Sequence, residues 1–165
     1  MSAAYFIADT HFGDRNILRY ENRPFADTDE MDRELISRWN LTVDKADAVY
    51  VLGDFGAEGY EEKILKQLNG KIFLVKGNHD KSSNEYYRKA GFCEVYDMPI
   101  IFNGFWILSH EPFYVNENMP YANLFGHVHN SPLFKAYSSH HFCVSVERID
   151  YKPISLDEIF AKVNS

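Results

Sequence analysis

Residues 71–80 read Lys-Ile-Phe-Leu-Val-Lys-Gly-Asn-His-Asp, a short apolar run that ends in a cluster of polar residues. Such runs, rich in β-branched and aromatic residues, are typical of buried strands. Two similar runs, 3–8 and 46–52, end next to Asp9 and Asp54. Strands that alternate with helices are usually parallel, and their carboxyl ends meet at one edge of the sheet, where α/β proteins bind ligands. We therefore expect the polar ends of these three strands to converge.

Helical patterns fill the segments between these strands. Asp27 and Glu30 have the spacing of a capping box, and apolar residues then repeat at helical intervals as far as Trp39. Shorter helices are predicted over 60–69 and 83–90. The alternation of strand and helix favours a parallel sheet in this half of the chain.

The pattern changes after residue 90. Five short strands are predicted in close succession, near 93–97, 99–102, 104–109, 123–126 and 140–147. The pair Asn103-Gly104 is typical of a tight hairpin turn, and the close spacing favours an antiparallel arrangement. A second capping-box spacing, Ser155 to Glu158, opens a final helix that ends near residue 163.

Length and charge indicate a folded chain of one domain, which we expect to span residues 1–165. A chain of 165 residues with 45% hydrophobic residues can bury one core without disulfides. Its formal net charge of −7 opposes the approach of a polyanion. A small substrate is therefore the expected partner, and long duplex nucleic acid is not.

The cysteines and the N-terminus bear on the cellular compartment. Cys93 and Cys143 are flanked by apolar or aromatic residues, and two cysteines are too few for a secreted disulfide framework. We expect both to be buried, reduced thiols. The apolar stretch 1–8 is shorter than the apolar core of a signal peptide and has no basic flank. These features predict a cytoplasmic protein without a membrane partner.

Residues that commonly bind metals stand at the ends of the predicted strands. Five of the seven histidines fall in these motifs, which are Asp9-Thr-His11, Gly53-Asp54, Gly77-Asn78-His79-Asp80, His110 and Gly126-His127-Val-His129. In a strand, residues i and i+2 point to the same side, so Asp9 and His11 are expected to bind one ion together. The glycines allow the backbone to approach a metal or a phosphate oxygen closely.

The donor types narrow the choice of metal. Imidazole, carboxylate and carboxamide donors without thiolate suit Mn²⁺, Fe, Zn²⁺ or Ni²⁺ better than Cu(I) or Ca²⁺. Each motif alone is more often a turn or a cap than a ligand set, so the specificity lies in their order. The pair His140-His141 has no second ligand at a useful spacing, and we interpret it as structural.

The series Asp-x-His, Gly-Asp, Gly-Asn-His-Asp, His and Gly-His-x-His, in this order between residues 9 and 129, resembles the calcineurin-like metallophosphoesterase superfamily. The resemblance implies an α/β (α+β) fold, a four-layer αββα sandwich of two mixed β-sheets flanked by helices. It also implies a dinuclear site at the carboxyl ends of the strands, holding two divalent transition-metal ions. Mn²⁺ is the first expectation, with Fe, Zn²⁺, Ni²⁺ or Co²⁺ as alternatives.

The resemblance also assigns roles to the motif residues. A hydroxide bridging the two ions would attack the phosphorus atom. His79 would face the substrate and donate a hydrogen bond or a proton, while Asp80 orients its ring. One ion would be bound by Asp9, His11, Asp54 and His129, and the other by Asp54, Asn78, His110 and His127.

Three arginines, Arg15, Arg19 and Arg23, follow the first motif closely. They are candidates for contacts to a phosphate or a base, and a solvated basic face is an equal alternative. The stretch resembles a branch of small bacterial and phage-type phosphoesterases in which position 14 is often His. This chain has Asp14.

The expected function is metal-dependent hydrolysis of a small phosphomonoester or phosphodiester, with nucleotides among the candidates. The segment 55–59 lacks the Asp-Arg-Gly that follows Gly-Asp in protein Ser/Thr phosphatases and diadenosine tetraphosphate hydrolases, which argues against both activities. A nuclease acting on short oligonucleotides is the first alternative. A non-catalytic scaffold is the second, and the presence of every ligand and of His79 argues against it.

Overall fold

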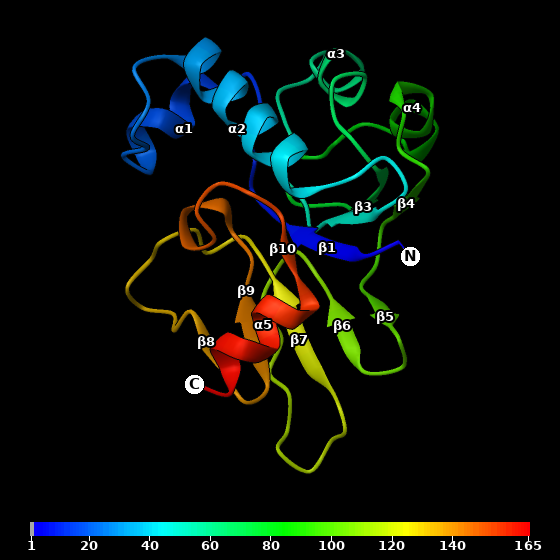
Figure 1. Cartoon of the computed structure of the whole chain (residues 1–165), viewed down its shortest axis with the longest axis vertical. Coiled ribbons are helices and arrows are strands. Elements are labelled where there is room, and N and C mark those ends of the chain that lie inside the picture. The colour runs from blue at the N-terminus through cyan, green and yellow to red at the C-terminus, as the bar shows by residue number, and fades with distance from the viewer. Residues whose placement is uncertain (1) are drawn as a thin grey trace.

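Among residues 2–165, which the computed structural model describes, ten strands form two five-stranded sheets (Figure 1). In the first sheet β1 to β4 are parallel neighbours, and β10 is antiparallel to β1. The parallel order predicted from the alternation of strands and helices is therefore confirmed. The strands, in spatial order, are β10 (Ile154–Ser155), β1 (Ala4–Ile7), β2 (Ala48–Val51), β3 (Lys71–Val75) and β4 (Glu94–Tyr96).

The second sheet is mixed, so the expectation of an antiparallel second half is wrong. Its central strands β6, β7 and β9 are parallel, and only the outer strands β5 and β8 are antiparallel to their neighbours. The long connection 109–121 returns the chain to the starting edge before β7 begins. The strands, in spatial order, are β5 (Ile100–Phe102), β6 (Trp106–Leu108), β7 (Ala122–Phe125), β9 (His141–Cys143) and β8 (Tyr137–Ser138).

Two of the predicted strands differ in place or length. The strand predicted over 93–97 is β4, and it pairs with β3 in the first sheet. The strand predicted over 140–147 ends at Cys143, because the chain turns into the 3₁₀ helix η1 (Val146–Arg148). The implied architecture of two mixed sheets flanked by helices is confirmed.

The helices follow the predicted caps closely. Asp27 Oδ1 accepts a hydrogen bond from Glu30 N at 2.8 Å, but the Glu30 carboxylate accepts from Ala26 N, so only half of that capping box forms. Ser155 and Glu158 form both halves of theirs. The first helix was not predicted. The helices are α1 (Arg15–Tyr20), α2 (Thr28–Thr42), α3 (Glu61–Leu65), α4 (Asn84–Ala90) and α5 (Leu156–Val163).

Aromatic rings fill the space between the two sheets. Phe6, Tyr50 and Phe73, from the neighbouring strands β1, β2 and β3, stack with ring centroids 5.8 Å and 4.9 Å apart. Phe102 of β5 packs edge-on against Phe6 at 5.5 Å and against Tyr50 at 5.2 Å. Aromatic pairs of this kind contribute about 0.5–1.5 kcal/mol beyond their burial. The contacts of Phe102 with Phe6 and Tyr50 therefore stabilise the packing of the two sheets.

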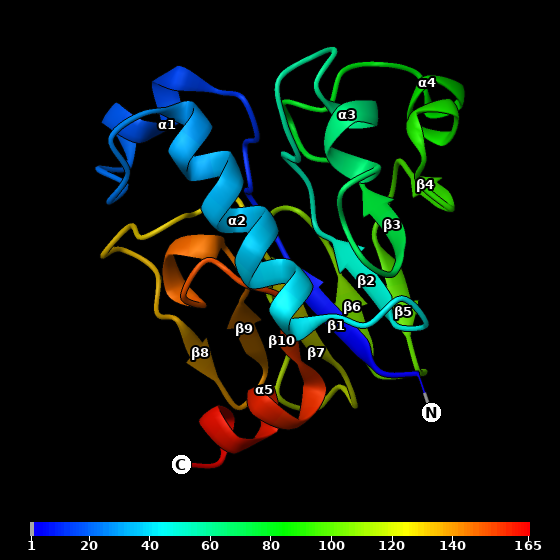
Figure 2. The same cartoon turned by 45° about the horizontal axis from the view of Figure 1, so that its top comes forward.

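The helix α2 lies across the first sheet (Figure 2). Met31, Leu35 and Trp39 lie one or two turns apart and are almost wholly buried in the main core. The indole of Trp39 also donates a hydrogen bond to Asn69 O at 2.9 Å. Full burial of such side chains contributes about 1.5–3 kcal/mol each. The packing of α2 thus stabilises the first sheet, and the loops that follow its strands start from a rigid support.

The connection 109–121 is anchored on the second sheet by Asn123, which is wholly buried. Asn123 Oδ1 accepts a hydrogen bond from Phe113 N at 2.8 Å, and its amide donates to Ile107 O at 2.9 Å.

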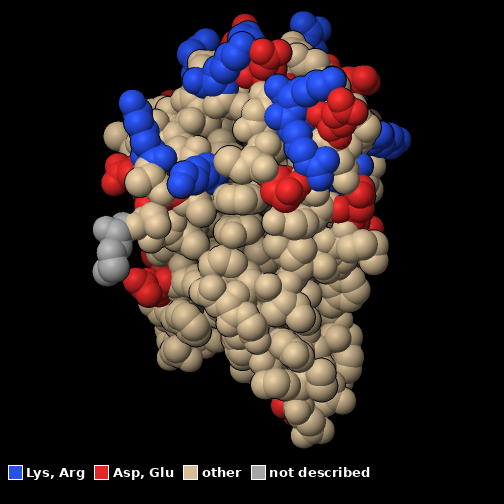
Figure 3. All heavy atoms as spheres, turned by 90° about the vertical axis from the view of Figure 1, so that its right-hand side faces the viewer, with Lys and Arg blue, Asp and Glu red and all other residues tan. Residues whose placement is uncertain are grey.

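The charged side chains are unevenly distributed over the surface. Figure 3 shows that they gather over one half of the face it draws, whereas the half over β5 and β6 carries almost none.

The two cysteines differ in exposure. Both are free thiols; Cys143 is buried as predicted, but Cys93 is exposed. The neighbouring residues Phe92 and Val95 take the buried positions at this end of the first sheet. Within residues 2–165, no helix combines the length and apolar character needed to span a bilayer.

Candidate metal centre

The predicted ligands lie beyond the strand ends and have an unusual backbone conformation. β1 ends at Ile7, so the i, i+2 alternation of a strand does not apply to Asp9 and His11. His127 and His129 follow the end of β7 at Phe125, and their ligand atoms belong to separate groups. Five predicted ligands have positive φ angles: Asp9 (60°), His11 (49°), Asp54 (55°), His127 (69°) and His129 (48°). Asp and His tolerate this region better than most residues, but it still costs roughly 1–3 kcal/mol each, and such strain clusters at functional sites.

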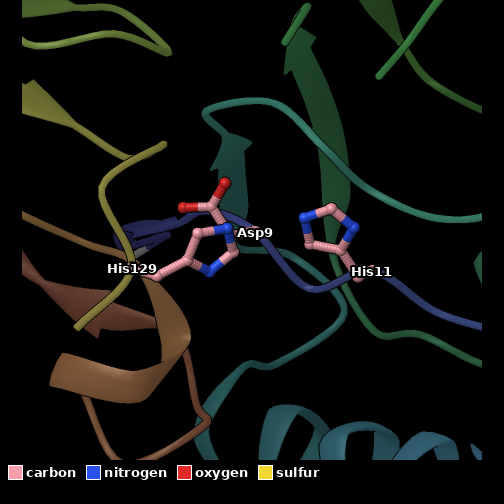
Figure 4. Close-up of side chains that lie close together, drawn as sticks. All are labelled: Asp9, His11 and His129. Atoms are coloured by element: carbon pink, nitrogen blue, oxygen red, sulfur yellow. The ribbon is translucent and has the colours of Figure 1, made fainter. Parts of the chain in front are cut away.

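The first group of ligand atoms comes from two segments. Asp9 and His11 follow β1 and His129 follows β7, and their ligand atoms lie within 4.8 Å of one another (Figure 4). Asp9 Oδ1 and His11 Nε2 are buried and have no hydrogen-bond partner within the described residues. Buried polar atoms are nearly always paired. These two atoms are therefore available to bind an ion.

The second group lies beside the first. The ligand atoms of Asp54, His110 and His127 lie within 4.8 Å of one another. Asn78 Oδ1 joins them, at 2.9 Å from His110 Nε2 and 3.1 Å from His127 Nδ1. Oxygen and nitrogen donors thus converge from the ends of β2, β3, β6 and β7.

Asp54 stands between the two groups. Its Oδ2 lies 3.6 Å from His11 Nε2 in the first group and 3.4 Å from His110 Nε2 in the second. Its other oxygen, Oδ1, accepts a hydrogen bond from His79 N at 2.9 Å. One carboxylate oxygen therefore faces an imidazole of each group.

Contacts through Nδ1, two of them hydrogen bonds, orient three of the imidazoles. The Nδ1 atom of His110 lies 2.7 Å from Leu52 O, and that of His129 lies 2.8 Å from Glu147 Oε1. His11 Nδ1 lies 3.4 Å from Asp14 Oδ2. Each contact leaves Nε2 free to face an ion, which is the usual arrangement around metal-bound histidines. Asp14 thus supports His11, and its other oxygen caps α1.

Arg23 is not placed to contact a substrate, so the prediction made for it is wrong. It is buried, and its guanidinium donates to Thr10 O at 2.8 Å, Asp9 O at 2.6 Å and Glu147 Oε1 at 2.8 Å. The same Glu147 oxygen contacts His129. Arg23 therefore connects the backbone of Asp9 and Thr10 to Glu147, which in turn contacts the predicted ligand His129.

Glu147 was missed by the sequence reasoning, because it stands alone after β9 without motif spacing. It also belongs to a third possible ligand group, with Glu21 and His129. Arg23 and His129 contact its Oε1, whereas its Oε2 is buried and has no hydrogen-bond partner within the described residues. Glu147 therefore supports His129 and is also a candidate ligand through Oε2.

Arg15 and Arg19 are exposed on α1. Within residues 2–165 neither side chain has a hydrogen bond or an ion pair. A contact of either with a phosphate stays a prediction.

Asp80 has a different position from the one implied. Its carboxylate accepts from the backbone N–H groups of Asp54 (2.7 Å), Gly77 (2.8 Å) and Phe55 (3.2 Å). Within the described residues it has no hydrogen bond to the ring of His79, so it does not orient that ring. It joins the loop after β3 to the loop after β2, which fixes Asp54.

His79 lies at the rim of the site. It is exposed, and its ring stands nearly edge-on to that of His11 with centroids 5.5 Å apart. Its backbone N–H donates to Asp54, whereas its ring makes no hydrogen bond within residues 2–165. The orientation of the ring is therefore not fixed by a hydrogen-bond partner in this part of the chain.

Two glycines make room for ligand side chains. A Cβ at Gly53, where φ is +91°, would overlap His110 Nδ1, and a Cβ at Gly77 would overlap Asp54 Oδ1. We expected these glycines to admit a metal or a phosphate oxygen to the backbone. In the structure, the atoms that come close to these two glycines belong to the predicted ligands His110 and Asp54.

The ionisation of the site without an ion is unusual. Burial raises the pKa of Asp9 to about 6 and lowers that of His11 to about 4. At His110 burial is outweighed by a hydrogen bond with Asp54 and by nearby carboxylates, so its pKa rises to about 9. The hydrogen bonds that Asp54 accepts outweigh its burial and lower its pKa to about 2. Protons and metal ions compete for these atoms, so binding of an ion releases protons.

The donors present therefore fit two divalent ions. Each group supplies imidazole nitrogen and carboxylate oxygen. Three buried side-chain atoms, Asp9 Oδ1 and His11 Nε2 of the first group and Glu147 Oε2 beside it, have no hydrogen-bond partner within the described residues. This mixture suits borderline transition-metal ions.

Comparison with known proteins identifies the family. The profile of the calcineurin-like phosphoesterase family, Metallophos, matches residues 4–161. The uncharacterized protein MJ1445 of Methanocaldococcus jannaschii is 37% identical over 171 residues, covering 96% of this chain and 90% of that protein. The Gene 66 protein of Mycobacterium phage L5 is 31% identical over 85 residues, covering 48% of this chain and 41% of that protein.

Solved structures share the fold. The crystal structure of protein AQ665 of unknown function from Aquifex aeolicus has a TM-score of 0.74 and 28% identity, covering 99% of this chain and all (100%) of that one. The Pseudomonas putida nuclease MPE has a TM-score of 0.53 and 23% identity, covering 76% of this chain and 61% of that one, and it supports the fold alone. Because the family profile spans nearly the whole chain, we conclude that the chain belongs to the calcineurin-like phosphoesterase family, whose chemistry is metal-dependent hydrolysis of phosphoesters.

Proposed function

We propose that this chain hydrolyses a small phosphomonoester or phosphodiester with the help of two divalent transition-metal ions, Mn²⁺ foremost. The observation that carries the proposal is the position of Asp54 Oδ2, 3.6 Å from His11 Nε2 and 3.4 Å from His110 Nε2. A carboxylate shared between two groups of donors is what a pair of ions requires. One ion would be held by Asp9, His11, Asp54 and His129, and the other by Asp54, Asn78, His110 and His127.

The ions would supply Lewis acidity toward the phosphate and would lower the pKa of the attacking water. The chain contributes geometry. The carboxylate of Asp54 accepts a hydrogen bond from His79 N, and the backbone N–H of Asp54 donates one to the buried carboxylate of Asp80. Such preorganisation lets the site stabilise charge on the transferring phosphoryl group without rearranging during the reaction.

His79 is proposed to donate a hydrogen bond or a proton to the ester. Its exposed ring at the rim, beside His11, supports this assignment. A general acid at this position would protonate the leaving oxygen, which matters most for a basic alkoxide. Asp80 is not part of this step, because its oxygens are engaged by backbone N–H groups.

A nuclease that acts on short oligonucleotides is the second candidate. The fold is shared with the Pseudomonas putida nuclease MPE, and Asn78 and His79 lie exposed at the site. The net charge of −7 disfavours a long duplex. A dinucleotide or a short single strand carries few phosphates, so this charge opposes it less.

The experiment is hydrolysis of p-nitrophenyl phosphate and bis(p-nitrophenyl) phosphate by the protein loaded with Mn²⁺. We expect turnover by the wild type and by His140→Ala, a control outside both groups, and none by metal-free protein. A scaffold would bind the ions without turnover of either ester. Absence of turnover with two ions bound would overturn the proposed function.

A further inference from the structure

A pocket of about 260 Å³ opens beside the second group of ligands. Asn78 and His110 form its wall toward the metal centre. This volume lies slightly below the range typical of ligand pockets, about 300–1,000 Å³, and suits one compact organic group. Its other lining residues include Lys76, Asp97, Pro99, Glu111 and Phe113.

The charges of this pocket do not suit a second phosphate. Its one lysine, Lys76, is engaged, with Nζ 3.1 Å from Asp97 Oδ1 and 3.2 Å from Asn84 Oδ1. The exposed carboxylate of Glu111 has no ion-pair partner within residues 2–165. An additional anionic group would therefore meet an unbalanced negative charge. Hydroxyl or amino groups could instead donate hydrogen bonds to Glu111.

Phe113 gives the pocket an exposed aromatic face. The side chain is 49% exposed, although the backbone is fixed by the hydrogen bond from Phe113 N to the buried Asn123 at 2.8 Å. A ring held on an anchored backbone is a platform on which a planar ligand can stack. The pocket thus combines an aromatic platform, a hydrogen-bond acceptor and direct access to the metal centre.

We propose that this pocket binds a nucleoside group of the phosphoester, with the base on Phe113 and a ribose or amino donor on Glu111. The proposal rests on the proposed function, because it needs the phosphate to lie at the metal centre. It narrows the substrate to a nucleotide with one phosphate at the reacting position. It also predicts that a second phosphate on the same nucleoside weakens binding.

The test is titration calorimetry of the Mn²⁺-loaded protein with adenosine 5′-monophosphate, methyl phosphate and adenosine 3′,5′-bisphosphate. We expect the monophosphate to bind at least about 5-fold more tightly than methyl phosphate, since stacking of one base typically gives about 5- to 150-fold. Phe113→Ala should remove most of this difference, and Glu111→Gln a smaller part. Neither change should alter the affinity for methyl phosphate.

Two matched variants control for changes of surface. Tyr137→Ala removes an aromatic side chain of similar exposure, 43%, outside this pocket, and Glu117→Gln neutralises an exposed acid of the same connection. Both should bind like the wild type. Equal affinities for adenosine 5′-monophosphate and methyl phosphate, or an equal loss for both ligands in Phe113→Ala, would overturn the proposal. Binding that depends on Phe113 without turnover of any ester would instead refute only the hydrolytic function.

Discussion

Replacing Arg23 by Met should strongly destabilise the protein. The change removes the hydrogen bonds from the guanidinium to Thr10 O, Asp9 O and Glu147 Oε1. It also leaves the carboxylate of Glu147, which is only 4% exposed, without its cationic partner. Breaking a buried ion pair from one side typically costs about 3–5 kcal/mol. For a domain of this size each 1 kcal/mol lowers Tm by about 2–4 °C, so we expect a fall of roughly 6–20 °C.

The assay is thermal unfolding in the presence of EDTA, so that differences in metal binding do not contribute. Arg19→Met is the matched control, because Arg19 is exposed on α1, and it should change stability by less than about 0.5 kcal/mol. The double variant Arg23→Met/Glu147→Gln should recover part of the loss, since it no longer buries an unpaired charge. If Arg23→Met unfolds within 2 °C of Arg19→Met, the reasoning about the buried pair is refuted.

Three further predictions concern the metal centre. Asp54→Asn should reduce activity and metal content more than His11→Ala does, because Asp54 faces both groups; equal retention of two ions with full turnover would contradict this. EDTA should abolish hydrolysis, and Mn²⁺, Co²⁺ or Ni²⁺ should restore it better than Mg²⁺, because imidazole donors suit borderline ions; restoration by Mg²⁺ alone would count against the ligand set. His79→Ala should lower kcat/KM about 10²–10⁴-fold for alkyl esters and much less for aryl esters, at unchanged metal content; an equal loss for both would show uniform phosphate binding instead of acid catalysis.

The sequence predicts which side chains converge, because their order along the chain follows the order of the strands. Parallel strands must deliver the residues at their carboxyl ends to one edge, so Asp54 and Asn78 had to approach each other. The backbone conformation could not be read in this way. The positive φ angles of Asp9 and His11 arise from loops beyond the strand, which apolar periodicity does not describe.

The supporting contacts were harder to foresee. Arg23 and Glu147 are 124 residues apart, and no local pattern links them. The position of Arg23 in the sequence, close to a predicted phosphate site, suggests a contact with the substrate. The side chain is buried, so it supports the structure of the site instead. Asp80 shows the same limit, because its backbone partners lie in a different loop. The mixed second sheet likewise depends on where the long connection 109–121 crosses, which strand spacing alone does not determine.

The most direct test of the central claim is a crystal structure of the Mn²⁺-loaded protein with anomalous data collected at the manganese edge. The account predicts two peaks about 3.5–4 Å apart, with the carboxylate of Asp54 between them. One would lie against Asp9, His11 and His129, and the other against His110 and His127. A single ion, or an ion held by the third ligand group around Glu147 in place of the first, would contradict the account.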